Sequence, residues 1–210
     1  MTARPVDGTV DGVLTTGLPP FAESRPSVRR AVEWALVMHA DQRRDVDQAP
    51  FVLHPLEVAS LLSGRGFDDD VVTAGVLHDI VEGTSVTLDD IDRRFGTRVA
   101  GLVAAVTENP DVADYAQRKA ALRDQVARAG RDACAIYAAD KVAKVRELRA
   151  KATRHPEVLR GRKLEHYRAS LDTLRACTKD LPLVDQLEFE LWALDVLPPS
   201  QPDNDGFTDR

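Results

Sequence analysis

The segment Ala74-Gly75-Val76-Leu77-His78-Asp79-Ile80-Val81-Glu82 decides the fold, because it sets a histidine and an aspartate inside an apolar run. Such a run predicts a buried helix, here over residues 70–82. An ionised Asp79 in that position would cost several kcal/mol unless a partner compensated its charge. A divalent cation beside His78 would do so. The segment therefore predicts a metal site within a helical core.

Two further segments offer ligands of the same kind. His54 precedes Pro55 at a predicted helix start, and Asp140 follows the largely apolar residues 135–139. Two imidazoles and two carboxylates suit Mn²⁺, Fe²⁺ or Zn²⁺ and suit Ca²⁺ poorly. Glu82 falls on the same helix face as His78 and Asp79, where it could orient or deprotonate a water molecule.

Each of these residues also has an ordinary structural interpretation. A histidine before a proline often marks only a loop that enters a helix, and a neighbouring histidine and aspartate often form a simple contact. Asp140 could pair with Lys144 or Arg146 on the same helix, and Glu82 could be a solvated surface acid. The metal hypothesis depends on these residues occurring together in one chain.

Outside these segments, apolar residues recur at steps of three and four, which is typical of amphipathic helices around a common core. No alternating pattern with hairpin turns predicts a sheet. The fold class is therefore all-α, a bundle of about eight to ten helices. Helices are predicted at 26–41, 55–64, 70–82, 87–94, 97–107, 114–128, 131–151, 161–179 and 183–196.

Composition limits the class of protein. We expect a flexible N-terminal arm at 1–25, one domain at 26–197 and a disordered tail at 198–210. The net charge of −6 argues against a nucleic-acid partner. No signal peptide or membrane-length apolar run is evident, so we expect a cytoplasmic protein. Cys134 and Cys177 are expected to be buried thiols, and apolar faces near Leu187 and Trp192 leave monomer and homodimer open.

Several sequence blocks at matching intervals resemble the HD hydrolase domain of RelA/SpoT-type proteins, in particular the stand-alone small alarmone hydrolases. The resemblance runs from about Ala31 to Leu174. The blocks are His39-x-x-Gln42-Arg43-Arg44, residues 49–59 around His54-Pro55, residues 77–84 around His78-Asp79, residues 95–100, Thr107-Glu108, residues 139–148 around Asp140, and Glu165-His166-Tyr167.

The resemblance implies an all-α domain that binds Mn²⁺ through His54, His78, Asp79 and Asp140, with Fe²⁺ or Zn²⁺ as alternatives. It implies a guanosine-3′,5′-bis(diphosphate) 3′-pyrophosphohydrolase of the stringent response, which removes pyrophosphate from the alarmone ppGpp. The roles it implies are catalysis by Glu82 and substrate contacts by Arg44 and Tyr167. The substrate would be a small phosphorylated nucleotide.

The chain departs from this family at three positions. Gly83 stands where the family has a second acid. The glycine either provides a helix stop or lowers the catalytic rate, unless Asp89 or an acid at 68–70 replaces the missing carboxylate. Lys144 stands where the family has asparagine, within reach of Asp140 or of a substrate phosphate. Asp45 follows the paired arginines, where close relatives tend to carry a base.

Two alternative functions follow from these departures. One is hydrolysis of another 3′-phosphorylated or pyrophosphorylated nucleotide, such as NADPH or a biosynthetic intermediate. The other is nucleotide binding with weak catalysis. His39 is expected to be structural or to support the ligands, and Arg118 and Lys119 are expected to be solvated.

Overall fold

The computed structural model describes residues 17–196 of the 210-residue chain. The predicted tail at 198–210 and residues 1–16 of the predicted arm lie outside the described residues. The described part of that arm includes a helical turn, and Ala22 within it is fully buried. Flexibility of the arm at residues 1–16 and disorder of the tail at 198–210 stay predictions.

The described residues form helices and no named strand, with one isolated bridge between Arg43 and Pro50. The all-α prediction is thus confirmed. The α-helices are α1 (Pro20–Glu23), α2 (Pro26–Met38), α3 (Leu53–Ser63), α4 (Asp69–Leu77), α5 (Ile80–Gly83), α6 (Leu88–Phe95), α7 (Thr97–Val106), α8 (Tyr115–Ala129), α9 (Arg131–Ala152), α10 (Arg162–Cys177) and α11 (Pro182–Val196), with a 3₁₀ turn η1 (Pro156–Arg160) before α10.

Side-chain caps explain where several helices begin. The carboxylate of Asp68 accepts a hydrogen bond from the Val71 amide at the start of α4. Thr87 and Asp90 form a reciprocal capping box at the start of α6. The carboxylate of Asp114 accepts a hydrogen bond from the Gln117 amide at the start of α8. Each cap satisfies a backbone N–H that the helix itself leaves without a partner.

The predicted continuous helix at 70–82 is wrong in one respect, because α4 ends at Leu77 and α5 begins at Ile80. His78 and Asp79 lie at this junction. The His78 ring pairs through Nδ1 with the carbonyl of Gly75 at 2.9 Å, the acceptor that the Asp79 amide would use in a continuous helix. The break turns both side chains toward one side of the core.

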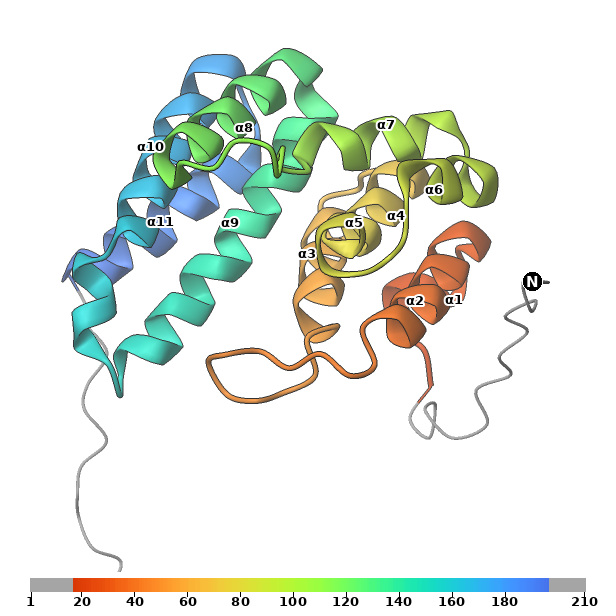
Figure 1. Cartoon of the computed structure of the whole chain (residues 1–210), viewed down its shortest axis with the longest axis horizontal. Coiled ribbons are helices and arrows are strands. Elements are labelled where there is room, and N and C mark those ends of the chain that lie inside the picture. The colour runs from red at the N-terminus through yellow and green to blue at the C-terminus, as the bar shows by residue number, and fades with distance from the viewer. Residues whose placement is uncertain (1–16, 197–210) are drawn as a thin grey trace, which may run out of the picture.

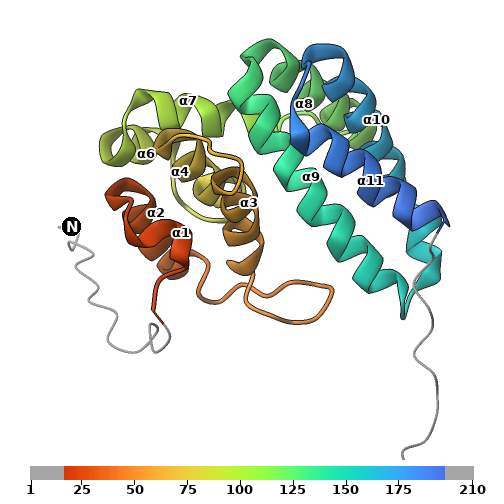
Figure 2. The same ribbon diagram turned by 180° about the vertical axis from the view of Figure 1, so that it is seen from behind.

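Helix α9 runs through the middle of the molecule (Figure 1). Helices α3, α4 and α7 contact one side of it, and α8, α10 and α11 contact the other. Seen from behind, α11 lies along α9 (Figure 2). Residues 133–143 of α9 are all buried, and many of them are alanines, whose small side chains let neighbouring helices approach closely. Asp140 therefore lies at the centre of the fold.

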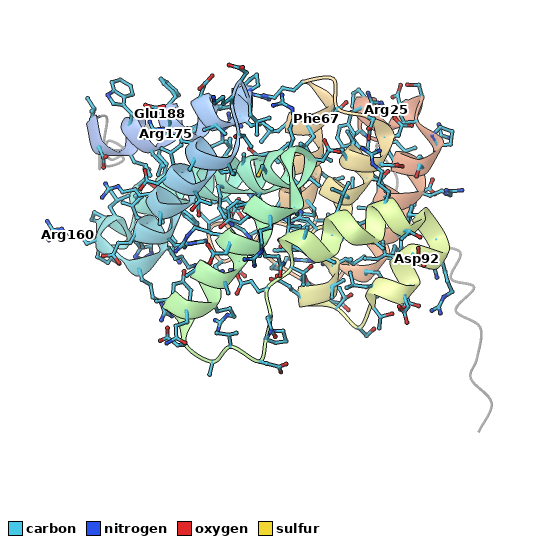
Figure 3. The ribbon with its side chains drawn as sticks, turned by 90° about the horizontal axis from the view of Figure 1, so that it is seen from above. Arg25, Phe67, Asp92, Arg160, Arg175 and Glu188 are labelled. Atoms are coloured by element: carbon cyan, nitrogen blue, oxygen red, sulfur yellow. The ribbon has the colours of Figure 1, made fainter. Side chains whose placement is uncertain are left out.

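Helix α11 packs antiparallel to α10. Ion pairs join Arg175 to Glu188 and Arg168 to Asp195, each at 2.6 Å, so the two helices run in opposite directions (Figure 3). Leu187 is fully buried between the helices, whereas Trp192 is 48% exposed. Phe189 and Trp192 belong to the exposed apolar part of this helix, while Leu187 itself belongs to the core.

The two cysteines lie close together at the ends of α9 and α10. Their Sγ atoms are 3.2 Å apart, Cys134 is buried and Cys177 is exposed. The expectation that both are buried is wrong for Cys177, because it is the last residue of its helix. No helix within residues 17–196 combines the length and the apolar character needed to cross a membrane.

Helices α3 and α4 approach closely at Gly75, which is fully surrounded by core residues. A Cβ atom built on Gly75 would lie 2.5 Å from Cδ1 of the buried Leu62 and 3.6 Å from the Cα atom of Ala59. A side chain at this position would push α4 away from α3. His54 lies in α3 and His78 directly follows α4, so the spacing of the two helices also affects the distance between these histidines.

We expect Gly75→Val to lower the free energy of unfolding by about 1–3 kcal/mol through overpacking. That corresponds to about 2–4 °C in melting temperature per kcal/mol for a domain of this size. Gly101→Ala is the matched control, because Gly101 is an exposed residue of α7 with no described atom within 4 Å of an added Cβ. Thermal unfolding followed by circular dichroism measures both. A Gly75→Val variant as stable as Gly101→Ala would contradict close packing here.

Candidate metal centre

The structure brings together the four predicted metal ligands from three different elements. His54 lies in α3, His78 and Asp79 at the α4–α5 junction, and Asp140 in α9. The Nε2 atom of His54 lies 3.1 Å from Asp140 Oδ1 and 3.5 Å from Asp79 Oδ2. The Nε2 atom of His78 lies 3.3 Å from Asp79 Oδ2 and 3.7 Å from Asp140 Oδ1. The nitrogen atoms of both histidines therefore lie close to an oxygen of each aspartate.

The other ring nitrogens of the two histidines differ in their contacts. Nδ1 of His78 donates to the Gly75 carbonyl at 2.9 Å, which in a neutral imidazole keeps the proton on Nδ1 and leaves the Nε2 lone pair for a cation. Nδ1 of His54 lies 3.4 Å from Glu147 Oε1 but forms no hydrogen bond among the described residues. Nε2 of His78 is buried without a hydrogen-bond partner among the described residues. This donor set fits a divalent cation.

The two carboxylates are ionised inside the protein. Burial opposes ionisation, but His78 and Lys144 outweigh it and hold the pKa of Asp79 well below its usual range. Burial likewise opposes ionisation of Asp140, and Lys141 and Lys144 hold its pKa well below the ordinary value. Conversely, burial works against the imidazolium of His78, but Asp79 and Asp140 raise its pKa to about 10. Cation binding must therefore release protons.

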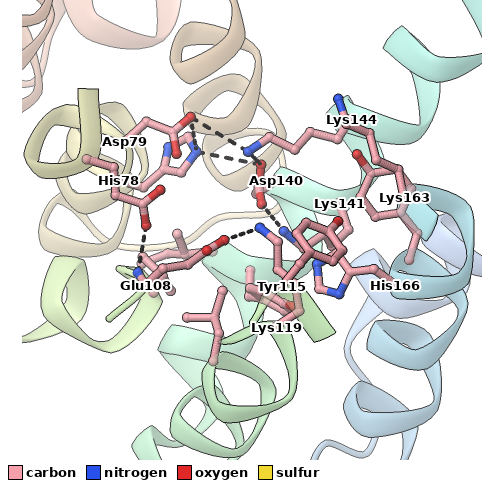
Figure 4. Close-up of a pocket in the computed structure, with 16 residues that line it drawn as sticks. His78, Asp79, Glu108, Tyr115, Lys119, Asp140, Lys141, Lys144, Lys163 and His166 are labelled. Atoms are coloured by element: carbon pink, nitrogen blue, oxygen red, sulfur yellow. Dashed lines mark hydrogen bonds and ion pairs between the residues drawn. The ribbon is translucent and has the colours of Figure 1, made fainter. Parts of the chain in front are cut away.

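Two lysines of α9 neutralise the same carboxylates. The Nζ atom of Lys144 lies 3.1 Å from Asp140 Oδ1 and 3.8 Å from Asp79 Oδ2. Lys141 Nζ lies 2.5 Å from the other oxygen of Asp140. Figure 4 shows the Lys144 side chain reaching between the two aspartates. The position four residues after Asp140 thus brings Lys144 to this carboxylate, as the helical spacing predicts.

A pocket of about 720 Å³ opens beside the ligands (Figure 4). Its walls combine acids, four lysines and aromatic rings. They include His78, Asp79, Glu82, Glu108, Tyr115, Lys119, Asp140, Lys141, Lys144, Lys163, His166 and Tyr167. Glu82, Lys144 and Tyr167, which the sequence predicts as catalytic and substrate-contacting residues, therefore all line this pocket.

Arg44 does not line this pocket. It borders an adjoining pocket of about 670 Å³, which shares Lys144, Lys163 and Tyr167 with the first. Its guanidinium pairs with Asp47 and lies 3.5 Å from Glu147. A contact between Arg44 and a substrate phosphate would have to replace these ion pairs.

Glu82 lies in α5 at the mouth of the pocket. Its Oε1 atom accepts a hydrogen bond from the Glu108 amide at 2.6 Å, which leaves Oε2 without that constraint. The residue is exposed to solvent, yet the protein packed around its carboxyl group raises the pKa above the ordinary value of glutamate. A raised pKa is typical of carboxylates that exchange protons in catalysis.

Gly83 follows directly and ends α5, as a helix stop would. Its φ angle is not among the positive values that favour glycine, and an added Cβ would meet Gln42 at an ordinary 3.5 Å. The backbone therefore does not require glycine here. The suggested replacement acids do not reach the pocket, because Asp68 and Asp70 pair with Arg98 on the surface and Asp89 is exposed on α6.

The sequence does not identify several residues of the pocket. Lys119 and Arg118 were expected to be solvated, but both pair with Glu108, and Lys119 is only 20% exposed. His166 is also inside, where burial and nearby cations lower its pKa to about 2. These residues come from α8, α10 and the loop after α7, so only the packing of those segments brings them together. His39 is buried and pairs with Gln42, in line with a structural role.

The fold and the site define an all-helical domain built around a buried cluster of histidines and aspartates. Residues 31–166, more than half of the chain, match the HD domain family, and the chain belongs to that family. The resemblance seen in the sequence blocks is thereby confirmed. Membership of the HD family implies a divalent metal, and the ligand atoms of His54, His78 and Asp140 lie within 4.8 Å of one another.

Relatives agree with this assignment. The guanosine-3′,5′-bis(diphosphate) 3′-pyrophosphohydrolase of Drosophila melanogaster is 34% identical over 123 residues, which is 56% of this chain and 66% of that protein. The enzyme of the same name from Aquifex aeolicus is 39% identical over 88 residues, 42% of this chain but only 12% of that protein.

Two solved structures share the fold. A metazoan ortholog of SpoT that hydrolyses ppGpp superposes with a TM-score of 0.69 at 24% identity, covering 87% of this chain and 100% of that chain. A protein from Listeria monocytogenes gives a TM-score of 0.60 at 28% identity, covering 68% and 94%.

The contact between Glu147 and His54 leads to a test of the metal centre. We expect Glu147→Gln to weaken Mn²⁺ binding by about 10–100-fold, because carboxylates that orient ligand histidines contribute that much to metal affinity. Calorimetric titration of metal-stripped protein measures the effect. Glu57→Gln is the control, since Glu57 pairs with Arg146 instead of with a histidine. Equal Mn²⁺ affinities of the two variants would exclude this role for Glu147.

Proposed function

We propose that this protein is a metal-dependent phosphohydrolase that removes pyrophosphate from the 3′ position of ppGpp. The observation that carries the proposal is the convergence of His54, His78, Asp79 and Asp140 next to a lysine-lined pocket with Glu82 at its mouth. The names of the relatives support ppGpp as the substrate. The chain covers only 12% of the Aquifex protein, and the proposal concerns the domain that the two share.

The proposed ligands are the two histidines and two aspartates, and the proposed ion is Mn²⁺, with Fe²⁺ or Zn²⁺ as alternatives that accept the same donors. When bound, the cation would supply a more acidic water and positive charge beside the phosphoryl group. The remaining roles belong to side chains of this chain.

Glu82 is the proposed proton acceptor. Its Oε1 atom is fixed by the Glu108 amide, and Oε2 remains available to take a proton from the attacking water. The raised pKa brings this carboxylate closer to the working pH of a general base. Glu82 thus combines a fixed position with a suitable proton affinity.

Lysines and one tyrosine of the pocket are the proposed substrate contacts. Lys119, Lys144 and Lys163 offer positive charge to the pyrophosphate that leaves, where cations offset the developing negative charge. Tyr167 borders both pockets and can contact the nucleoside. Arg44 is the proposed phosphate contact in the adjoining pocket after exchange of its present carboxylate partners.

The proposed role of Glu82 is tested with Glu82→Gln. We expect kcat for pyrophosphate release from ppGpp to fall by about 10²–10⁴-fold, the usual contribution of a general base. Mn²⁺ affinity should change little, since Glu82 contacts none of the four proposed ligands. Glu188→Gln, an exposed acid of α11 paired with Arg175, is the control.

The pH profile separates a proton acceptor from a structural carboxylate. The raised pKa means that Glu82 is protonated, and activity is lost, at a higher pH than for an ordinary glutamate. The wild-type rate should therefore decline on the acid side as pH falls through this pKa, and the decline should vanish in Glu82→Gln. A variant that retains both rate and acid limb would remove Glu82 from the mechanism.

A related substrate is the second candidate, because Gly83 and Lys144 change the charge of the site. We expect a panel of ppGpp, NADPH and other 3′-phosphorylated nucleotides, with phosphate and pyrophosphate detected separately, to show ppGpp as the best substrate. Gly83→Asp is tolerated by the backbone and tests whether the missing acid limits the rate. Faster turnover of a different nucleotide would reject ppGpp.

A further inference from the structure

Lys144 contacts the same carboxylate oxygens that face the two histidines. Its ammonium lies 3.1 Å from Asp140 Oδ1, and that oxygen is also 3.1 Å from His54 Nε2. It lies 3.8 Å from Asp79 Oδ2, which is 3.3 Å from His78 Nε2. The lysine therefore belongs to the proposed ligand cluster itself and is more than a neighbour of it.

Two lysines already offset the negative charge of the carboxylates in this cluster. Asp79 and Asp140 carry two negative charges, and Lys141 and Lys144 carry two positive charges. The ammonium of Lys144 already contacts Asp140 Oδ1, and a divalent cation held by these carboxylates would add positive charge next to it. Like charges at such short separations repel strongly at the effective dielectric constant of a protein. Cation binding in the absence of an anion must therefore work against Lys144.

The Lys144 side chain also lies next to a second pocket, away from the carboxylates. Its side chain is 31% exposed and borders both pockets, whereas Lys141 is only 4% exposed and is held at the other oxygen of Asp140. Beyond Lys144 lies the adjoining pocket with Arg44 and Lys163. A phosphate group there would accept the ammonium and offset the charge that the cation adds.

We propose that Lys144 couples metal binding to substrate binding: it weakens binding of the divalent cation to the free protein and strengthens it when a phosphorylated ligand is present. The proposal rests on the proposed function in taking the ligand to be a nucleotide and in taking the cation to bind at Asp79 and Asp140. Coupling of this kind is reciprocal, because a ligand that raises metal affinity is itself bound more tightly when the metal is present.

The first measurement uses Mn²⁺ alone and no nucleotide. Lys144→Gln and Lys144→Asn remove the charge, and Lys144→Arg keeps it. Lys163→Gln removes an equal charge from the same pockets, although Lys163 forms no ion pair with Asp79 or Asp140 in the described structure. Calorimetric titration of metal-stripped proteins should show Mn²⁺ binding at least about tenfold tighter in the two neutral variants, since a close like charge has been removed. Lys144→Arg and Lys163→Gln should remain near the wild type.

The second measurement repeats the titration with guanosine monophosphate as the phosphorylated probe. The wild type should bind Mn²⁺ more tightly with the probe than without it, and Lys144→Gln should show a much smaller gain. A neutral variant that needs metal to fold is tested by thermal unfolding at increasing Mn²⁺ concentrations. Its melting temperature should rise more steeply with Mn²⁺ concentration than that of the wild type, because tighter binding stabilises the folded state more.

Two outcomes would overturn the proposal: neutral variants that bind Mn²⁺ no more tightly than the wild type, or a gain in Lys163→Gln as large as that in Lys144→Gln. An equal probe effect in wild type and Lys144→Gln would also overturn it. The titrations need no turnover. A protein that releases no pyrophosphate from ppGpp would thus reject the proposed function and leave this result standing or failing by itself.

Discussion

The structure depends on placing two ionised carboxylates inside a helical core. Asp79 is 14% exposed and Asp140 is 7% exposed at their side chains, and both face the same histidine nitrogens. Charges in such a place are tolerated only when opposite charges and hydrogen bonds replace water. Lys141, Lys144 and the imidazoles provide this replacement. Every element that carries one of these groups must therefore pack in a fixed position.

Two features of the fold satisfy this constraint. His78 and Asp79 lie at the junction between α4 and α5, and the Nε2 atom of His78 is 3.3 Å from Asp79 Oδ2, so both residues contribute to one cluster. The alanine-rich face of α9 lets α3 and α4 come close to Asp140. Gly75 serves the same end, because it lets α4 approach α3 and sets the distance between the two histidines.

The four proposed ligands could be selected from the sequence because each stands in a local pattern: a histidine before a helix proline, a histidine–aspartate pair in an apolar run, and an aspartate after a largely apolar stretch. The helix break could not be predicted, because it involves the ring nitrogen Nδ1 of His78 as the partner of the Gly75 carbonyl in place of the Asp79 amide. The pairing of Glu108 with Lys119 and of Glu147 with His54 also escaped prediction. These contacts join elements whose relative positions only tertiary packing determines.

Gly83 and Lys144 change the charge of the site in the same direction. Gly83 removes the negative charge of the family's second acid, although the backbone does not require glycine at this position. Lys144 adds a positive charge next to the carboxylates. Together they make the centre more cationic than the family pattern implies. A more cationic centre favours anionic ligands and disfavours a bare divalent ion. The proposed ligand set and the proposed coupling of metal and phosphate binding thus depend on the same two carboxylates.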